Sequence, residues 1–136
     1  MKVSYKKSIT FKVLKRIQRL SSNIILRSDV SSISNPRQIS RALARLVETG
    51  YLAKLGYGVY AKLTRSELTQ TTYLNAGVLP TMRAALSKLN IRWEPSQEEQ
   101  DYQAGISTQI PANPTTKLKN RFRRQLSYRG MELKRG

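Results

Sequence analysis

Apolar residues near the start of the chain recur at the spacing of one helix face. Val13, Ile17 and Leu20 share a stripe, and the side chains opposite them are lysines and arginines. This spacing predicts an amphipathic helix over residues 8–20. The basic outer face of this helix is a candidate for contacts with DNA phosphates, and it carries Lys12, Lys15, Arg16 and Arg19.

The next apolar run, residues 24–26, is too short for a helix and has polar neighbours on both sides. It predicts a short strand. Asp29 follows, and its side chain can accept a hydrogen bond from a backbone amide. We therefore expect Asp29 to begin a helical turn that ends near Ser32.

The clearest helix signals lie between residues 35 and 50. Asn35 is a good N-cap, Pro36 suits the first helical position, and Gln38 stands three residues after the cap. Gly50 can end the helix in a left-handed conformation. The apolar residues between these ends repeat on one stripe, which consists of Ile39, Leu43, Leu46 and Val47.

The polar side of this second helix presents groups that can hydrogen-bond base edges or phosphates in a DNA groove. A solvated surface with no ligand explains the same residues equally well, so both interpretations stay open for this helix taken alone. The candidate DNA contacts from this segment are Asn35, Arg37, Gln38, Ser40, Arg41 and Arg45.

A glycine-rich hairpin is predicted directly after this helix. Residues 51–54 and 59–62 alternate as strands do, and two glycines lie between them. A helix, a short helix, a capped helix and a hairpin follow one another in winged helix-turn-helix proteins. In that arrangement Lys54 and Tyr57 reach phosphates or the minor groove, whereas we expect Tyr60 to pack.

The second half of the chain carries two further helix signals. Pro80 can open a helix, and Ser96 begins a capping-box pattern. Trp93 lies between them and is expected to anchor the core. The nearby carboxylates of residues 98–101 lie in a helix-cap context without histidine, which favours a structural over a catalytic role.

The last segment, from Thr115 onward, alternates between turn residues and strand-like residues. It predicts a small antiparallel sheet with a basic face. We expect Lys117 and Lys119 to share one side of a strand. The candidate contacts with DNA in this tail are Lys117, Lys119, Arg121, Arg123 and Arg124.

These elements predict an α+β fold with two parts. Residues 1–63 form a winged helix-turn-helix DNA-binding domain, and residues 64–136 form a small α+β module that ends in short antiparallel strands with a basic tail. The 136 residues are enough for one ordinary domain or two small ones.

The net charge of +17 indicates a polyanionic partner. The charge is uneven: residues 1–63 carry 13 basic and 2 acidic side chains, residues 64–110 carry 4 and 5, and residues 111–136 carry 8 and 1. Basic ends around a neutral middle favour a surface that binds nucleic acid. A charge run that is only solvated is the weaker alternative.

The sequence contains no cysteine and no histidine. Thiolate and imidazole catalysis, disulfides and the usual zinc sites are therefore excluded, and we expect no enzyme activity, no cofactor and no metal. The sequence also has no run of about 18 apolar residues and no signal-peptide pattern at its start. We expect a cytoplasmic protein that does not contact membranes.

Residues 29–62, above all Ile39–Gly50 followed by Gly58-Val59-Tyr60, resemble the AbiEi-like antitoxin and regulator family, which has an N-terminal winged helix. The segment Gly105-Ile-Ser-Thr-Gln-Ile-Pro111 is similar to a downstream motif of the same family. The resemblance implies a regulator that represses its own operon and neutralises a nucleotidyltransferase-like toxin in a type IV toxin-antitoxin pair. This chain has a shorter C-terminal part, and it carries Tyr57 where the family often has a basic residue.

Three functions follow from these features. The first is a sequence-specific regulator that binds double-stranded DNA and represses its own operon. The second is an antitoxin whose partner is a protein toxin. The third is an RNA-binding or ribosome-associated protein, which the pI near 10.7 permits but no exposed stacking aromatics support. The sequence leaves open whether a homodimer binds the DNA.

Overall fold

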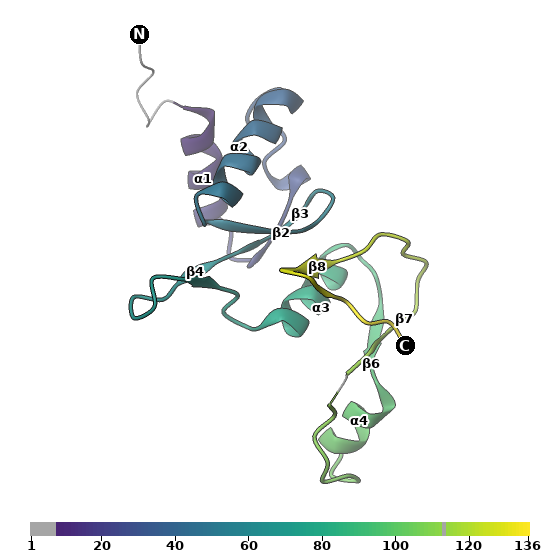
Figure 1. Cartoon of the computed structure of the whole chain (residues 1–136). Coiled ribbons are helices and arrows are strands. Elements are labelled where there is room, and N and C mark those ends of the chain that lie inside the picture. Colours follow the sequence, from purple (N-terminus) through teal and green to yellow (C-terminus); the bar gives the residue numbers. More distant parts are fainter. Residues whose placement is uncertain (1–7, 113) are drawn as a thin grey trace. The chain divides into compact units, whose positions relative to one another are not determined.

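The computed structural model describes residues 8–112 and 114–136, and the chain divides into two compact units (Figure 1). The first unit runs to Gly77, and the second is Val78–Gly136. The described residues contain four α-helices and small antiparallel sheets, which confirms the α+β class. No helix in this described part is long and apolar enough to cross a membrane.

The first helix, α1, spans Ile9–Arg19 and is preceded by an N-cap residue, Ser8, which was not predicted as a cap from the sequence. The Ser8 hydroxyl accepts a hydrogen bond from the backbone N–H of Phe11 at 3.1 Å. This bond satisfies one of the amides that the first turn of a helix leaves without a partner. The face that α1 buries carries Val13, Leu14 and Ile17, as the apolar spacing predicts.

The second long helix, α2, spans Pro36–Glu48 and has the predicted start and end. The side-chain oxygen of Asn35 accepts a hydrogen bond from the N–H of Gln38 at 3.0 Å. Beyond the C-terminus, Gly50 has a φ of +88°, a conformation that glycine adopts without strain. Local sequence signals therefore set both ends of α2.

Three strands form an antiparallel sheet in the order β1-β3-β2. They are β1 (Ile24–Leu26), β2 (Leu52–Gly56) and β3 (Val59–Lys62). The register of β2 with β3 shifts between Lys54 and Gly56, so the hairpin bends just before its turn. The core of the first unit consists of this sheet packed with the buried faces of α1 and α2.

The helical turn after β1 lies earlier than predicted. It is a 3₁₀ helix, η2, which spans Arg27–Asp29. The carboxylate of Asp29 accepts a hydrogen bond from the backbone N–H of Leu26 at 2.9 Å. The expected turn from Asp29 to Ser32 is therefore wrong. Asp29 is the last residue of this 3₁₀ helix, and its carboxylate bonds the backbone of Leu26, the residue before the first helical one.

The first unit continues past residue 63, where we expected the first domain to end. The strands β4 (Thr64–Arg65) and β5 (Thr72–Tyr73) pair with each other. This hairpin is grouped with the first unit, and Leu74 beyond it is buried. A domain boundary after residue 63 would therefore separate this hairpin from the unit that contains it.

The second unit begins with α3 (Val78–Lys88), which starts two residues before the predicted Pro80. It continues with β6 (Trp93–Pro95) and α4 (Gln97–Gln103). The predicted capping box of α4 is present: Ser96 accepts from the N–H of Glu99 at 3.2 Å, and the Glu99 carboxylate accepts from the N–H of Ser96.

The tail does not form the single basic sheet that its alternation predicts. Instead, β7 (Thr116–Leu118) pairs with β6, and β8 (Ser127–Tyr128) pairs with β9 (Met131–Glu132). Residues 119–126 contain no strand. The prediction failed because β7 pairs with a strand more than twenty residues earlier, and local alternation carries no information on such a partner.

Trp93 is half-buried and does not belong to the buried core, contrary to the expectation. Its indole N–H donates to the hydroxyl of Ser87 at 2.9 Å. The guanidinium of Arg83 lies over the ring, 4.9 Å from its centroid. The ring thus covers a buried cation while its indole N–H remains hydrogen-bonded. Tryptophan commonly plays this role at partly solvent-exposed positions.

Candidate nucleic-acid interface

The solvent face of α2 gathers most of the side chains that we predicted to contact base edges. Arg37, Ser40, Arg41 and Arg45 are exposed, and Gln38 is half-buried. They share one face because Ile39, Leu43 and Leu46 occupy the opposite side and are at most 1% exposed. Asn35 differs from them, because its side-chain oxygen caps the helix.

The outer face of α1 places four cations in solvent, as predicted. Two of them have local partners: the ammonium of Lys15 lies 5.6 Å from the ring centroid of Phe11, and Nη1 of Arg16 donates to the carbonyl of Asp29 at 3.4 Å. A hollow of about 340 Å³ runs along this face. The four exposed cations are Lys12, Lys15, Arg16 and Arg19.

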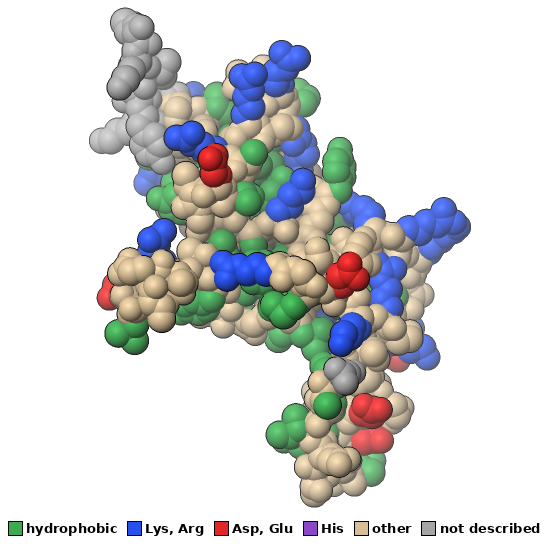
Figure 2. All heavy atoms as spheres, viewed as in Figure 1, with side chains coloured by type: hydrophobic (Ala, Val, Ile, Leu, Met, Phe, Trp, Pro, Cys, Tyr) green, Lys and Arg blue, Asp and Glu red, His purple; other side chains and the backbone are tan. Residues whose placement is uncertain are grey.

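Lys and Arg side chains gather over α1 and α2 on the face seen in Figure 2. The acidic residues of the first unit are Asp29, Glu48 and Glu67, and Asp29 is engaged by the backbone of Leu26. This excess of positive charge gives the first unit a surface that attracts polyanions.

Among the described residues of the first unit, the most exposed aromatic side chain lies in the turn of the β2–β3 hairpin. Tyr57 is 79% exposed and is followed by Gly58, whose φ is +68°. Lys54 is exposed on β2, opposite Tyr60 on β3. An exposed phenol and an ammonium on one hairpin can contact phosphates or sugar edges.

Tyr60 packs as expected and is only 7% exposed in the core of the first unit. Burial raises the pKa of its phenol above the ordinary value of 10.0, and the nearby Arg27 guanidinium partly offsets this rise. The phenol therefore stays protonated near neutral pH and remains a hydrogen-bond donor.

A groove of about 550 Å³ lies between α2 and the hairpin. One wall is the helix, which contributes residues three or four positions apart, and the other wall is the hairpin turn. Arg27, which our sequence reasoning missed, also lines it. The residues around the groove are Arg27, Pro36, Ser40, Ala44, Val47, Lys54, Tyr57, Gly58 and Tyr60.

The candidate residues of the tail lie in the second unit and do not share one strand face. Lys117 is in β7, whereas Lys119 follows it and forms an ion pair with Glu94 at 3.3 Å. Arg121 and Arg123 are exposed in a segment without strands. The guanidinium of Arg124 lies 5.4 Å from the ring centroid of Phe122.

Two acidic residues of α4, Glu99 and Asp101, make structural contacts. Glu99 pairs with Arg83, and the carboxylate of Asp101 accepts from the side-chain amide of Gln97 at 2.9 Å. Within the described ranges, no group of three His, Cys, Asp or Glu side chains is arranged to hold a metal ion.

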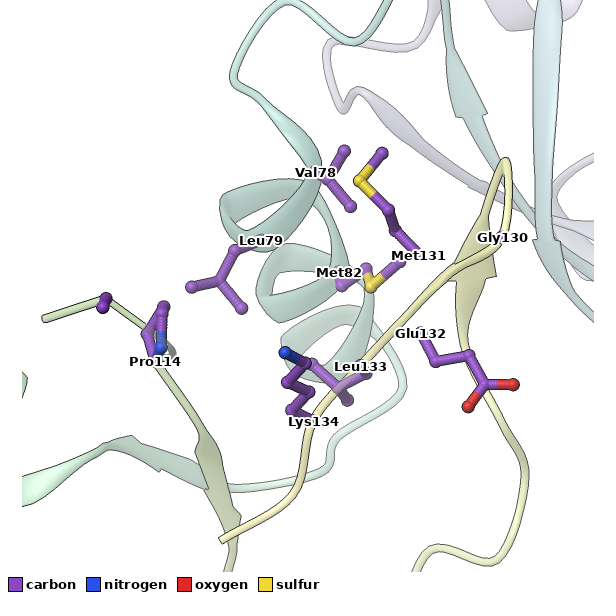
Figure 3. A pocket seen from close by; sticks show the side chains of 10 residues that line it. Val78, Leu79, Met82, Pro114, Gly130, Met131, Glu132, Leu133 and Lys134 are labelled. Atoms are coloured by element: carbon purple, nitrogen blue, oxygen red, sulfur yellow. The ribbon is translucent and has the colours of Figure 1, made fainter.

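The second unit also has an apolar hollow of about 640 Å³ (Figure 3). Its walls are the start of α3, with Val78, Leu79 and Met82, and the chain around Met131 and Leu133. Met131 is 49% exposed. An apolar hollow of this kind suits a hydrophobic side chain or a small apolar ligand better than it suits a phosphate.

No known protein family matches the sequence, and neither a curated protein nor a solved structure matches it.

Proposed function

We propose that the chain is a sequence-specific transcriptional regulator that binds double-stranded DNA through its first unit. The observation that carries this proposal is the exposed basic face of α2, with Arg37, Ser40 and Arg41, beside the hairpin that bears Lys54 and Tyr57. Helices that read DNA present arginine and small polar side chains in this way.

The order of elements supports a winged helix-turn-helix arrangement for the first unit. A helix, a strand, a short helical turn, a capped helix and a hairpin follow one another, and the sheet order is β1-β3-β2. In this arrangement α2 enters the major groove with its N-terminal half nearest the bases. The hairpin then lies over the adjacent backbone.

Two kinds of contact with DNA are assigned to the first unit, one for affinity and one for sequence preference. The cations of α1, such as Lys15, bind phosphates and supply affinity for any sequence, whereas Arg37 and Arg41 on α2 read base edges. Phosphate contacts alone give little selectivity. Repression of its own operon is the role that the resemblance to AbiEi-like regulators adds.

A gel-shift competition with the full chain tests this proposal. The probes are duplex DNA from the gene's own upstream region, an unrelated duplex of equal length, and a structured RNA. We expect the upstream duplex to be bound most tightly. Equal binding to all three, or a preference for the RNA, would refute sequence-specific DNA binding.

A protein toxin as partner is the second candidate function, and the apolar hollow around Met131 favours it. Exposed methionine beside buried aliphatic side chains is a common feature of surfaces that bind proteins. The test is co-expression with the neighbouring gene in cells. Rescue of growth by the wild-type chain, lost in Met131→Asp while DNA binding persists, would support this function.

A further inference from the structure

Arg27 connects the two walls of the groove between α2 and the hairpin. Its backbone N–H donates to the carbonyl of Gly58 in the hairpin turn at 2.9 Å. Its Nη2 donates to the carbonyl of Pro36, in the first turn of α2, at 2.8 Å. One residue of η2 therefore holds the hairpin turn on one side and the start of α2 on the other.

The chemistry of the groove favours an anion. Among the described residues that line it, Arg27 and Lys54 are the charged ones, and none is acidic. Ser40, Tyr57 and Tyr60 add hydroxyl groups to the same lining. Guanidinium, ammonium and hydroxyl donors together are the groups that proteins use to bind phosphate oxygens.

The guanidinium of Arg27 keeps donors for a ligand. Among the described residues, the guanidinium makes one hydrogen bond, in which Nη2 donates to the carbonyl of Pro36. Arginine carries five N–H donors in a planar fork. Nε and Nη1 are therefore able to bind phosphate oxygens while Nη2 holds the helix.

The anion that B-DNA offers to this groove is a strand of its phosphate backbone. A single phosphodiester strand separates the major groove from the neighbouring minor groove, and these are about 12 Å and 6 Å wide. If α2 lies in the major groove and the hairpin turn reaches the next minor groove, the strand between them must cross the space between these two elements. That space is the groove of about 550 Å³.

We propose that this groove seats one phosphodiester strand and that Arg27 has two roles in it. Arg27 binds a phosphate, and it fixes the spacing between α2 and the hairpin so that both elements meet DNA in register. This inference rests on the proposed function of the first unit. It adds a contact residue and a positioning role to that function.

The test measures binding of full-length variants to the tightest duplex selected from a random library, and to an unrelated duplex, over a range of salt concentrations. Arg27→Ala removes the proposed phosphate contact and the side-chain bond to Pro36, and keeps the backbone bond to Gly58. We expect it to weaken binding to both duplexes, to lower the slope of log affinity against log salt by about 1, and to reduce the preference for the selected duplex.

Arg27→Lys separates the two roles, because it keeps the charge but loses the planar fork. We expect the salt slope to stay near the wild-type value while the preference for the selected duplex falls. Arg65→Ala is the matched control, because it removes an exposed cation of the first unit that does not line the groove. It should change the slope less than Arg27→Ala does.

A change on the DNA keeps the test valid if Arg27→Ala folds poorly. Neutral methylphosphonates are placed at single positions of the selected duplex and tested with the wild-type chain and with Arg27→Lys. We expect neighbouring positions on one strand to weaken binding. At one of them the loss should be smaller for Arg27→Lys than for wild type, because the lysine makes fewer hydrogen bonds there.

The outcomes separate this inference from the proposed function. A wild-type chain that binds duplex DNA but shows equal slopes for Arg27→Ala and Arg65→Ala would overturn the groove proposal alone. A wild-type chain that binds no duplex, or prefers RNA, would overturn both.

Discussion

The guanidinium of Arg83 on α3 donates two hydrogen bonds to the carboxylate of Glu99 on α4, at 2.8 and 2.6 Å. Both side chains are mostly buried, with 10% and 13% of their surface exposed. Nε of Arg83 donates in addition to the hydroxyl of Thr116 on β7 at 3.0 Å. One ion pair thus joins two helices and a strand of the second unit.

This pair makes the second unit sensitive to acid. The hydrogen bonds from Arg83 hold the pKa of Glu99 below its ordinary value of 4.5. A carboxylate with a depressed folded-state pKa contributes stability that is present above its unfolded pKa and lost as the pH falls through the folded pKa. We expect the second unit to lose stability as the pH falls below 4.5.

Glu99→Gln tests this expectation with the single tryptophan, Trp93, as the reporter of the second unit. The variant should unfold more easily near neutral pH by about 3 kcal/mol, because it leaves Arg83 buried without its countercharge. Its stability should also depend less on pH than that of wild type. Glu98→Gln, at an exposed neighbour on the same helix, is the control, and equal pH dependence in Glu99→Gln and wild type would contradict the account.

The cap of α2 gives a second prediction. The Asn35 side chain bonds the amide of Gln38, so Asn35→Ala should lower the stability of this helix end by about 1 kcal/mol. Hydrogen exchange at the Gln38 amide measures the effect locally. Asn35→Ser, which can cap as well, should restore protection. If serine fails to do so, Asn35 has another role.

The sequence predicted best those features that depend on neighbouring residues. The ends of α2 follow from Asn35, Pro36 and Gly50. The glycines on either side of Tyr57 predict the hairpin, because caps and turns are local structures. The exposed face of α2 followed from the same helix period, since fixing the buried stripe also fixes which side chains face solvent.

Features that depend on distant partners were missed. Arg83 carries no local sign that it will bind Glu99, 16 residues further along. Arg27 was overlooked because its contacts with Pro36 and Gly58 appear only when η2, α2 and the hairpin come together. The pairing of β7 with β6 was missed for the same reason.

The basic tail gives a third prediction. Arg121 and Arg123 are exposed in the second unit, and we expect them to add phosphate contacts to those of the first unit. The double variant Arg121→Ala/Arg123→Ala should bind duplex DNA more weakly, with a salt slope reduced by roughly 2. Unchanged affinity and slope would assign the tail to a protein partner and favour the antitoxin function.

Salt dependence of the wild-type chain gives a fourth prediction. If the cations of α1, α2 and the hairpin contact about 6 to 10 phosphates, the affinity for duplex DNA should fall roughly 10³- to 10⁵-fold between about 50 and 200 mM salt. Fluorescence anisotropy of a labelled duplex measures this fall. A nearly flat dependence would exclude a binding surface built from these cations.

Selection from a random duplex library with wild type and Arg41→Ala shows whether α2 reads DNA sequence. Lys15→Ala, on α1, is the matched variant, since it removes a proposed phosphate contact and leaves α2 unchanged. Arg41→Ala should weaken binding by about 1 to 3 kcal/mol and relax the selected motif at one base pair. Lys15→Ala should weaken binding to all sequences alike and leave the motif intact. The absence of any motif with wild type, or relaxation by Lys15→Ala instead of Arg41→Ala, would contradict the account.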